Sequence, residues 1–257
     1  MKKIRLDELL IARGIASTLK EARAAIMSGI VFHENRRVDK AGDMLAESAE
    51  LEIRDNSPQY VSRGGMKLEG ALEDFDLDPK GKICVDLGSS TGGFTDCLLQ
   101  KGAAEVYAFD VGKGLLDWRL RGDSRILLRE GFNVRYLTPE DLPRRVDLLT
   151  ADLSFISLAL ILPALKNCLP DTDLLLLVKP QFEGKPQEVD KGGIVRDETR
   201  RTAILNRTVT NARQLGFEVL GTAPSRLTGQ KGNQEYFLHL RAMPGGKQMA
   251  NSEGQWT

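Results

Sequence analysis

Apolar residues recur along the chain in short continuous runs, separated by segments with the spacing of amphipathic helices. The strand-like runs occupy residues 82–88, 105–112, 125–131, 145–155 and 173–180. Helical spacing is found at residues 67–75, 94–102, 115–122, 158–169 and 197–215. Since mostly apolar strands joined by helices form parallel sheets covered on both faces, this pattern predicts an α/β fold with a doubly wound sheet.

The last two apolar runs are not separated by a helical segment. They are FEVLGTAPS at residues 217–225 and QEYFLHLRA at residues 234–242. We therefore expect them to form an antiparallel pair at one edge of the sheet. The tail from residue 244 is rich in glycine and polar residues and is expected to be disordered.

The start of the chain has a pattern of its own, which predicts a separate small α+β domain. Leu6, Leu9 and Leu10 show helical spacing that ends at Gly14, and a second helical stripe follows in residues 17–29. Two short strand-like pieces, IVFHENRRV and AELEIRD, come next. Together with the linker NSPQYVSRGG, these patterns divide the chain into domains at 1–58 and 59–243 and a tail at 244–257.

Composition narrows the function classes. Of the 257 residues 41% are apolar, and 36 basic side chains balance 36 acidic ones, so any nucleic-acid binding must use local patches. No apolar run approaches the about 20 residues of a membrane helix, and the start lacks a signal-peptide pattern, so we expect a cytoplasmic protein.

Three widely spaced cysteines (Cys84, Cys97, Cys168) predict buried free thiols. With only His33 and His239, neither a metal site nor a histidine-based triad is expected.

The first 40 residues hold nine basic and five acidic side chains, and charge alone would favour an ordinary solvated surface. Their order is more specific: RLDELL, a glycine, a serine, an alanine-rich helix and GIV follow one another. This order resembles the S4 RNA-binding domain, although Asn35-Arg36 replaces the usual Asn-Gly turn. The resemblance implies phosphate and shape recognition of folded RNA. The candidate RNA-binding residues are Arg5, Arg13, Lys20, Arg23, Arg36 and, beyond the linker, Arg63.

A glycine-rich loop follows the first strand of the larger domain, in VDLGSSTGGFTDCLL. Its spacing differs from the dinucleotide-binding G-x-G-x-x-G and resembles motif I of S-adenosylmethionine-dependent methyltransferases. Asp110 ends the next strand, where an acceptor can bind the ribose hydroxyls of an adenosine cofactor. The candidate cofactor-binding residues are Asp86, Gly88, Ser89, Ser90, Thr91, Gly92, Gly93, Phe94, Asp110 and Asp152. The alternatives are that Gly88 only ends a strand, that Asp110 caps a turn, that Asp152 caps a helix, or that the cofactor is a nicotinamide.

Lys179 raises the central question, because it ends the apolar strand in TDLLLLVKPQFE. A lysine at a strand end is ordinarily a solvated one. Here Asp152 ends another strand, so both side chains should open into one crevice, and Lys67 and Glu235 are candidate neighbours. Burial and a second cation such as Lys67 favour a neutral lysine, whereas a nearby carboxylate opposes it; in its neutral form the amine can accept a proton from a ribose hydroxyl.

A four-residue pattern Lys-Asp-Lys-Glu is typical of FtsJ-type ribose 2′-O-methyltransferases. In addition SRGGMKL, GSSTGGFTDCLL, ADLSFISL, VKPQFE and GNQEYFL follow one another in the order of the TlyA family, which this chain resembles over residues 3–241. The resemblance implies a Rossmann-like methyltransferase domain fused to an S4 domain. It also implies S-adenosylmethionine as donor and methylation of a cytidine ribose in ribosomal RNA or ribosomal subunits. The implied catalytic residues are Lys67, Asp152, Lys179 as general base, and Glu235.

Two alternatives remain at this point: a membrane-active haemolysin-like protein, a label used in this family, and a non-catalytic rRNA-binding assembly factor. No strongly amphipathic basic segment supports the first, and the complete four-residue set disfavours the second. The sequence does not identify the modified nucleotide, the ribosomal subunit or the oligomeric state.

Overall fold

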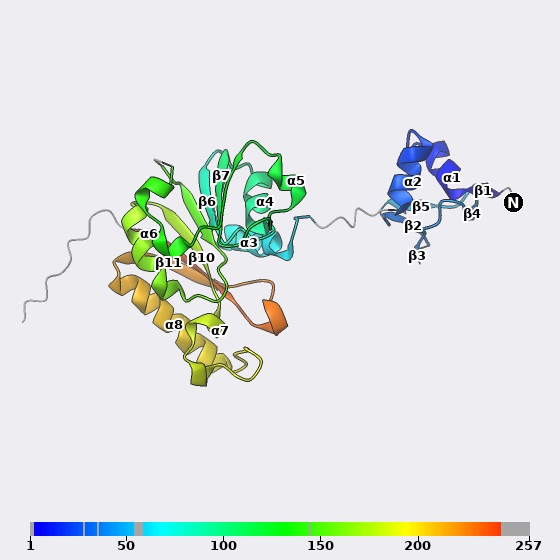
Figure 1. Cartoon of the computed structure of the whole chain (residues 1–257). Helices are drawn as coiled ribbons and strands as arrows, with labels where there is room; N and C mark the ends of the chain where they lie inside the picture. The colour runs from blue at the N-terminus through cyan, green and yellow to red at the C-terminus, as the bar shows by residue number, and fades with distance from the viewer. Residues whose placement is uncertain (1–2, 28, 35, 54–58, 144, 243–257) are drawn as a thin grey trace, which may run out of the picture. The chain divides into compact units, whose positions relative to one another are not determined.

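The computed structural model describes residues 3–27, 29–34, 36–53, 59–143 and 145–242. The chain separates into two compact units, Met1–Pro58 and Gln59–Thr257, which are taken one at a time below (Figure 1). Among the described residues, no helix has the length and apolar character needed to cross a membrane.

The first unit packs two helices, α1 (Leu6–Ala12) and α2 (Leu19–Met27), on short strands. One sheet has the order β3-β2-β5, formed by Arg36–Arg37, Val31–His33 and Leu51–Ile53. A second, two-stranded sheet pairs β1 (Lys3–Arg5) with β4 (Met44–Ala46), and the sequence pattern missed it because three-residue strands are too short to show alternation. Buried Leu6, Leu10, Ala22, Ile26 and Val31 form the core. The expected turn residue Asn35 lies outside the described residues.

Asp7 is a fully buried carboxylate in this unit. It accepts hydrogen bonds from Arg5 (Nε 3.0 Å, Nη2 2.9 Å) and from Arg23 Nε (3.0 Å). The hydrogen bond from Arg5, together with that from Arg23, lowers the pKa of Asp7 to about 2. Two of the predicted RNA contacts therefore also stabilise the fold.

The other predicted RNA-binding side chains of this unit have different surroundings. Arg13 donates to the carbonyls of Glu47 and Ala49, and Lys20 and Arg36 are exposed. Their contact with RNA, like the S4 assignment, stays a prediction.

The second unit is built on a seven-stranded sheet with the order β11-β12-β10-β9-β6-β7-β8. Its strands are β6 (Ile83–Leu87), β7 (Glu105–Asp110), β8 (Ile126–Glu130), β9 (Leu148–Ala151), β10 (Asp173–Val178), β11 (Phe217–Pro224) and β12 (Tyr236–Ala242). The five strands from β10 to β8 are parallel. β12 runs antiparallel to both β10 and β11, so the predicted antiparallel edge pair is confirmed. β11 is the edge strand, and β12 lies between β11 and β10.

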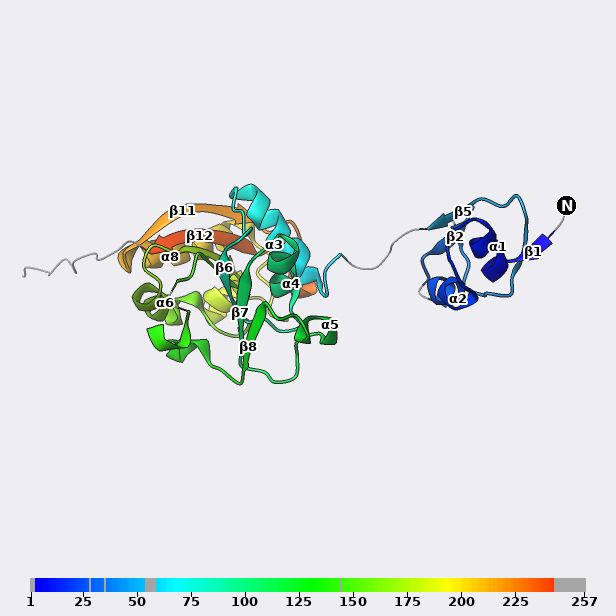
Figure 2. The ribbon, with the colours of Figure 1, turned by 90° about the horizontal axis from the view of Figure 1, so that it is seen from above.

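Helices cover both faces of this sheet, as the pattern predicted (Figure 2). Alternation along the strands divides the core, since Leu175 and Leu177 of β10 face one layer while Leu174 and Leu176 face the other. The first layer contains α3 (Arg63–Asp74) and α4 (Gly93–Gln100). The second contains α6 (Leu162–Cys168) and α8 (Glu198–Gln214). The α/β fold class is confirmed.

Two helices are shorter than their sequence patterns indicated. The segment 158–169 begins as a 3-10 turn (Leu158–Leu160), and α6 starts at Leu162 because Pro163 fits only the first turn of a helix. The segment 115–122 contains only α5 (Trp118–Arg121), which Asp117 caps by accepting from the Arg119 amide.

We predict that Asp7→Ala destabilises the first unit by about 1.5–3 kcal/mol, the range for hydrogen bonds to charged groups. Faster hydrogen exchange of the α1 and α2 amides in the full chain would measure the loss. The matched control is Glu8→Ala, an exposed neighbour 3.9 Å from Arg5. Because folding lowers the pKa of Asp7, its contribution is complete above the unfolded value of about 4 and disappears as pH falls through about 2. Equal effects of the two substitutions would contradict this account.

Candidate active site

The carboxyl ends of the parallel strands place four sequence-predicted residues along one edge of the sheet. Gly88 follows β6 and Asp110 ends β7. Asp152 follows β9, and Lys179 follows β10. Lys179 turns the chain into the short helix α7 (Pro180–Glu183), whose first position is a proline. Local geometry thus fixes where the backbone leaves the sheet, but it does not itself require a lysine at this position.

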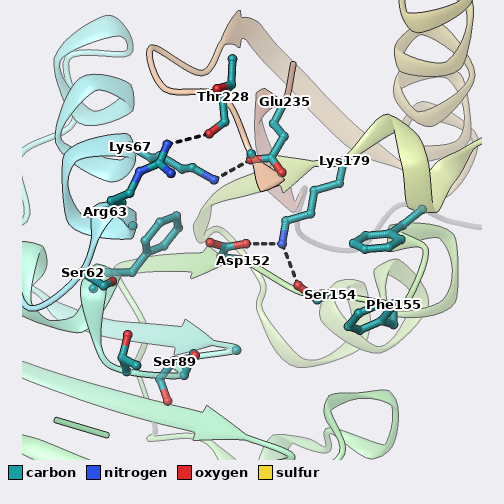
Figure 3. Close-up of a pocket in the computed structure, with 18 of the residues that line it drawn as sticks. Ser62, Arg63, Lys67, Ser89, Asp152, Ser154, Phe155, Lys179, Thr228 and Glu235 are labelled. Atoms are coloured by element: carbon teal, nitrogen blue, oxygen red, sulfur yellow. Dashed lines mark hydrogen bonds and ion pairs between the residues drawn. The ribbon is translucent and has the colours of Figure 1, made fainter. Parts of the chain in front are cut away.

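Two ion pairs lie side by side in the pocket at this edge (Figure 3). Lys179 Nζ lies 2.6 Å from Asp152 Oδ1 and donates to Ser154 Oγ at 3.0 Å. Lys67 Nζ donates to Glu235 Oε2 at 2.6 Å. The side chains of Lys67, Glu235 and Lys179 are only 11%, 3% and 10% exposed, so these charges are largely removed from water and must neutralise one another. Residues up to 168 positions apart therefore meet in one place.

A glycine leaves room for the second ion pair. A Cβ on Gly229 would lie 2.0 Å from Glu235 Oε1, so the loop before β12 can pass this carboxylate only without a side chain at that position. Lys67 extends from α3, and Arg63, one turn earlier, donates to the Thr228 carbonyl at 3.1 Å. The loop 225–235 and the start of α3 are thereby tied together across the pocket.

This pocket has a volume of about 300 Å³ and adjoins a larger cleft of about 860 Å³. The two share seven lining residues: Gly88, Ser90, Asp152, Ser154, Phe155, Gln181 and Phe182. The larger cleft continues past Asp110 and the apolar side chains of Val111, Leu115 and Phe132. Its volume is typical of small-molecule sites, and the Lys179–Asp152 pair lies where the two cavities join.

The glycine-rich loop and the first residues of α4 form one wall of the cavities. Gly88 has φ +83°, and a Cβ there would lie 2.7 Å from the Asp152 carbonyl oxygen. Gly92 has φ +97°, and a Cβ there would meet Leu120 and Leu116. The glycines thus allow close contacts within the protein as well as access to the cleft. Of the predicted loop residues, Gly88, Ser89, Ser90, Thr91, Gly93 and Phe94 line a cavity and Gly92 does not.

The acidic residues predicted to bind a cofactor have different positions. Asp110 lines the larger cleft and accepts from the amides of Ser90 (2.7 Å) and Gly112 (2.6 Å), so it both orders the loop and faces the cleft. Asp86 is fully buried beneath the loop, lines neither cavity and accepts from Thr95 Oγ1 at 2.7 Å. Burial raises the pKa of Asp86 to about 7. Its contacts position α4 and give it no direct access to a ligand.

Sequence reasoning missed several lining residues, including Ser154, Phe155, Gln181 and Phe182. Phe155 is 89% exposed at the rim and has φ +62°, and its ring lies 5.1 Å from that of Phe182. Gln181 Oε1 is buried and has no hydrogen-bond partner among the described residues. All four lie within three residues of Asp152 or Lys179, so extending each motif along the chain would have found them.

Two further observations concern possible ligands. Ser89 Oγ is buried in the pocket wall and, within the described part of the chain, has no partner, as expected of a hydroxyl that binds a ligand. No group of three or more His, Cys, Asp or Glu among the described residues is arranged to hold a metal ion.

A model of the FtsJ-like methyltransferase family matches residues 60–242. YqxC of Bacillus subtilis, whose name proposes an rRNA methyltransferase, is 47% identical over 93% of this chain and 86% of its own length. The Mycobacterium tuberculosis protein named 16S/23S rRNA (cytidine-2′-O)-methyltransferase TlyA is 44% identical over 93% of this chain and 90% of its own. The solved structure of a Streptococcus thermophilus protein, which is named as a proposed hemolysin, has 40% sequence identity to this chain and a TM-score of 0.71. The match covers 95% of this chain and 90% of that one.

We predict that Lys67→Met lowers the free energy of unfolding by about 3–5 kcal/mol, because Glu235 is left buried and unpaired. Urea denaturation measures the change, and adding Glu235→Gln to the variant should recover part of it. The control is Lys101→Met, which breaks the more exposed pair with Glu69 and should cost about 0–1 kcal/mol. Similar costs for the two lysine variants would contradict the strong burial of the Lys67–Glu235 pair.

Proposed function

Because the chain belongs to the TlyA family of FtsJ-like methyltransferases, we propose that it methylates a ribose 2′-hydroxyl of ribosomal RNA with S-adenosylmethionine as donor. Cytidine, named for the M. tuberculosis relative, is the proposed nucleoside. The observation that carries the proposal is the junction of a nucleoside-sized cleft with a pocket that holds two lysine–carboxylate pairs.

The residues of the larger cleft fit an adenosyl cofactor. Asp110 faces the cleft and retains acceptor capacity for ribose hydroxyls, since each of its oxygens accepts only one backbone hydrogen bond. Val111, Leu115 and Phe132 offer an apolar surface for a base. The unpaired hydroxyl of Ser89, in the wall of the adjoining smaller pocket, can bind a polar group of the methionine part. When bound, S-adenosylmethionine supplies a methyl group on a positively charged sulfur.

Lys179 is the proposed general base. Its contacts with Asp152 and Ser154 hold Nζ at the junction of the cavities, within reach of a hydroxyl placed in the smaller pocket. Only the neutral amine can accept the 2′-hydroxyl proton. Asp152 then orients the amine.

The Lys67–Glu235 pair is proposed to bind the acceptor ribose. Lys67 extends from α3 into the same pocket, and Glu235 neutralises it at 2.6 Å. A lysine held in this way can donate a hydrogen bond to a sugar oxygen and keep the 2′-hydroxyl in line with the methyl group.

The rim of the pocket suits a single unpaired nucleotide. The exposed Phe155 ring offers a flat face on which a base can stack, and Arg63 places a cation on the opposite wall. The basic side chains of the first unit are proposed to bind RNA phosphates, which favours structured rRNA or a ribosomal subunit as the partner. A cytoplasmic location is consistent with such a substrate.

We predict that Lys179→Met lowers the rate of methyl transfer by about 10²–10⁴-fold, the contribution of a general base. Transfer of radiolabelled methyl to ribosomal subunits and to naked rRNA, followed by mapping of the modified ribose, measures the effect. Binding of S-adenosylmethionine, measured by calorimetry, should stay close to that of the wild type because Lys179 does not line the larger cleft.

The matched control is Lys80→Met, an exposed lysine just before β6, at the opposite edge of the sheet. It should keep full activity. Undiminished transfer by Lys179→Met would remove the general-base role, and wild-type protein that methylates a base or no RNA at all would remove the proposed function.

A further inference from the structure

The helix α7 carries one ionisable side chain that the proposed mechanism does not use. Glu183, four residues after Lys179, is partly buried, and burial raises its pKa. Its carboxylate points toward the loop Leu153–Ser157, which follows Asp152 and forms part of the wall of both cavities. The segment from Lys179 to Glu183 therefore touches this loop at more than one place.

Glu183 fixes the far end of the loop. Ser157 Oγ donates to Glu183 Oε2 at 2.6 Å, and the Leu158 amide donates to Glu183 Oε1 at 2.7 Å. The near end is fixed by Lys179, which donates to Ser154 Oγ at 3.0 Å. Both ends of the loop are thus held by side chains from a single five-residue segment.

Between these two points lies Phe155, whose conformation needs such support. It has φ +62°, a left-handed conformation unfavourable for a residue with a Cβ, and its ring is 89% exposed. Little burial compensates for the strained backbone, although the ring contacts Phe182 of α7 at 5.1 Å. Strained residues persist where the surroundings fix them, and here the bonds to Glu183 and Lys179 do so.

We propose that Glu183 is a positioning residue for catalysis: it clamps the loop Leu153–Ser157 so that the Phe155 ring is held at the pocket rim to receive the acceptor base. This inference rests on the proposed function, because it assigns Glu183 an effect on RNA methylation through Phe155. Glu183 itself touches neither cofactor nor acceptor. It lines neither cavity.

Hydrogen exchange of the loop tests the clamp directly. In Glu183→Ala, the amides of residues 153–158 should exchange faster than in the wild type, while the core strands β6 and β10 keep their protection. Glu183→Gln should restore wild-type exchange, because its amide can accept from Leu158 and donate to Ser157. Ser157→Ala removes one of the two bonds to Glu183, and also the bond that Ser157 Oγ accepts from the Ala159 amide. The amides of residues 153–157 should therefore give an intermediate result even if Glu183→Ala folds poorly. Unchanged exchange in both alanine variants would overturn the proposal.

A double-mutant cycle tests the link to catalysis. Phe155→Ala should lower kcat/KM for rRNA by about tenfold, which corresponds to one base–aromatic stacking contact. Glu183→Ala should lower it by a similar factor, Glu183→Gln should not, and the double variant should be no worse than either single one. Multiplying losses would mean that Glu183 acts independently of Phe155 and would overturn the proposal. Failure of the proposed function differs from this outcome, since the wild-type protein itself would then not methylate RNA.

Discussion

The site depends on pairing two largely buried lysine side chains with two carboxylates in one pocket. An isolated ammonium group or carboxylate is costly to remove from water, so each of these side chains persists near the sheet edge only because its partner is 2.6 Å away. The arrangement keeps amines inside a pocket without net charge. Amines held in this way have a fixed direction and little competition from water, which suits a donor that binds a hydroxyl. To act as a proton acceptor, Lys179 must first lose its own proton.

The fold brings the two ion pairs together in two different ways. Asp152 and Lys179 follow the neighbouring parallel strands β9 and β10, whose carboxyl ends meet at one edge of any such sheet. Lys67 and Glu235 do not follow parallel strands. Lys67 lies on α3, which precedes β6, and Glu235 immediately precedes β12, the antiparallel strand between β10 and β11. The insertion of β12 beside β10 carries Glu235 to the pocket, and the absence of a side chain on Gly229 leaves room for its carboxylate there.

Sequence reasoning reached the parts of this arrangement that depend on local pattern. Apolar runs of strand length predicted the parallel sheet, and strand ends predicted that Asp152 and Lys179 open into one crevice. Lys67 and Glu235 were named as candidate neighbours of Lys179 and, by family resemblance, as catalytic residues. Their pairing with each other was not predicted, because nothing local shows that β12 enters the sheet next to β10. Asp86 was expected to contact the cofactor, yet alternation along β6 does not reveal that its side chain turns beneath the loop to Thr95. Glu183 was overlooked because its partners Ser157 and Leu158 lie 26 and 25 positions earlier in the chain, so no local pattern connects them.

The central claim is that the two cavities meet where the methyl group is transferred. A crystal structure with S-adenosylhomocysteine and an RNA fragment containing the target nucleotide tests it most directly. We expect the cofactor sulfur beside Asp152 at the junction of the cavities, with the 2′-oxygen between it and Lys179 Nζ. A cofactor bound elsewhere, or a sulfur directed away from the pocket that holds Lys67 and Lys179, would contradict the account.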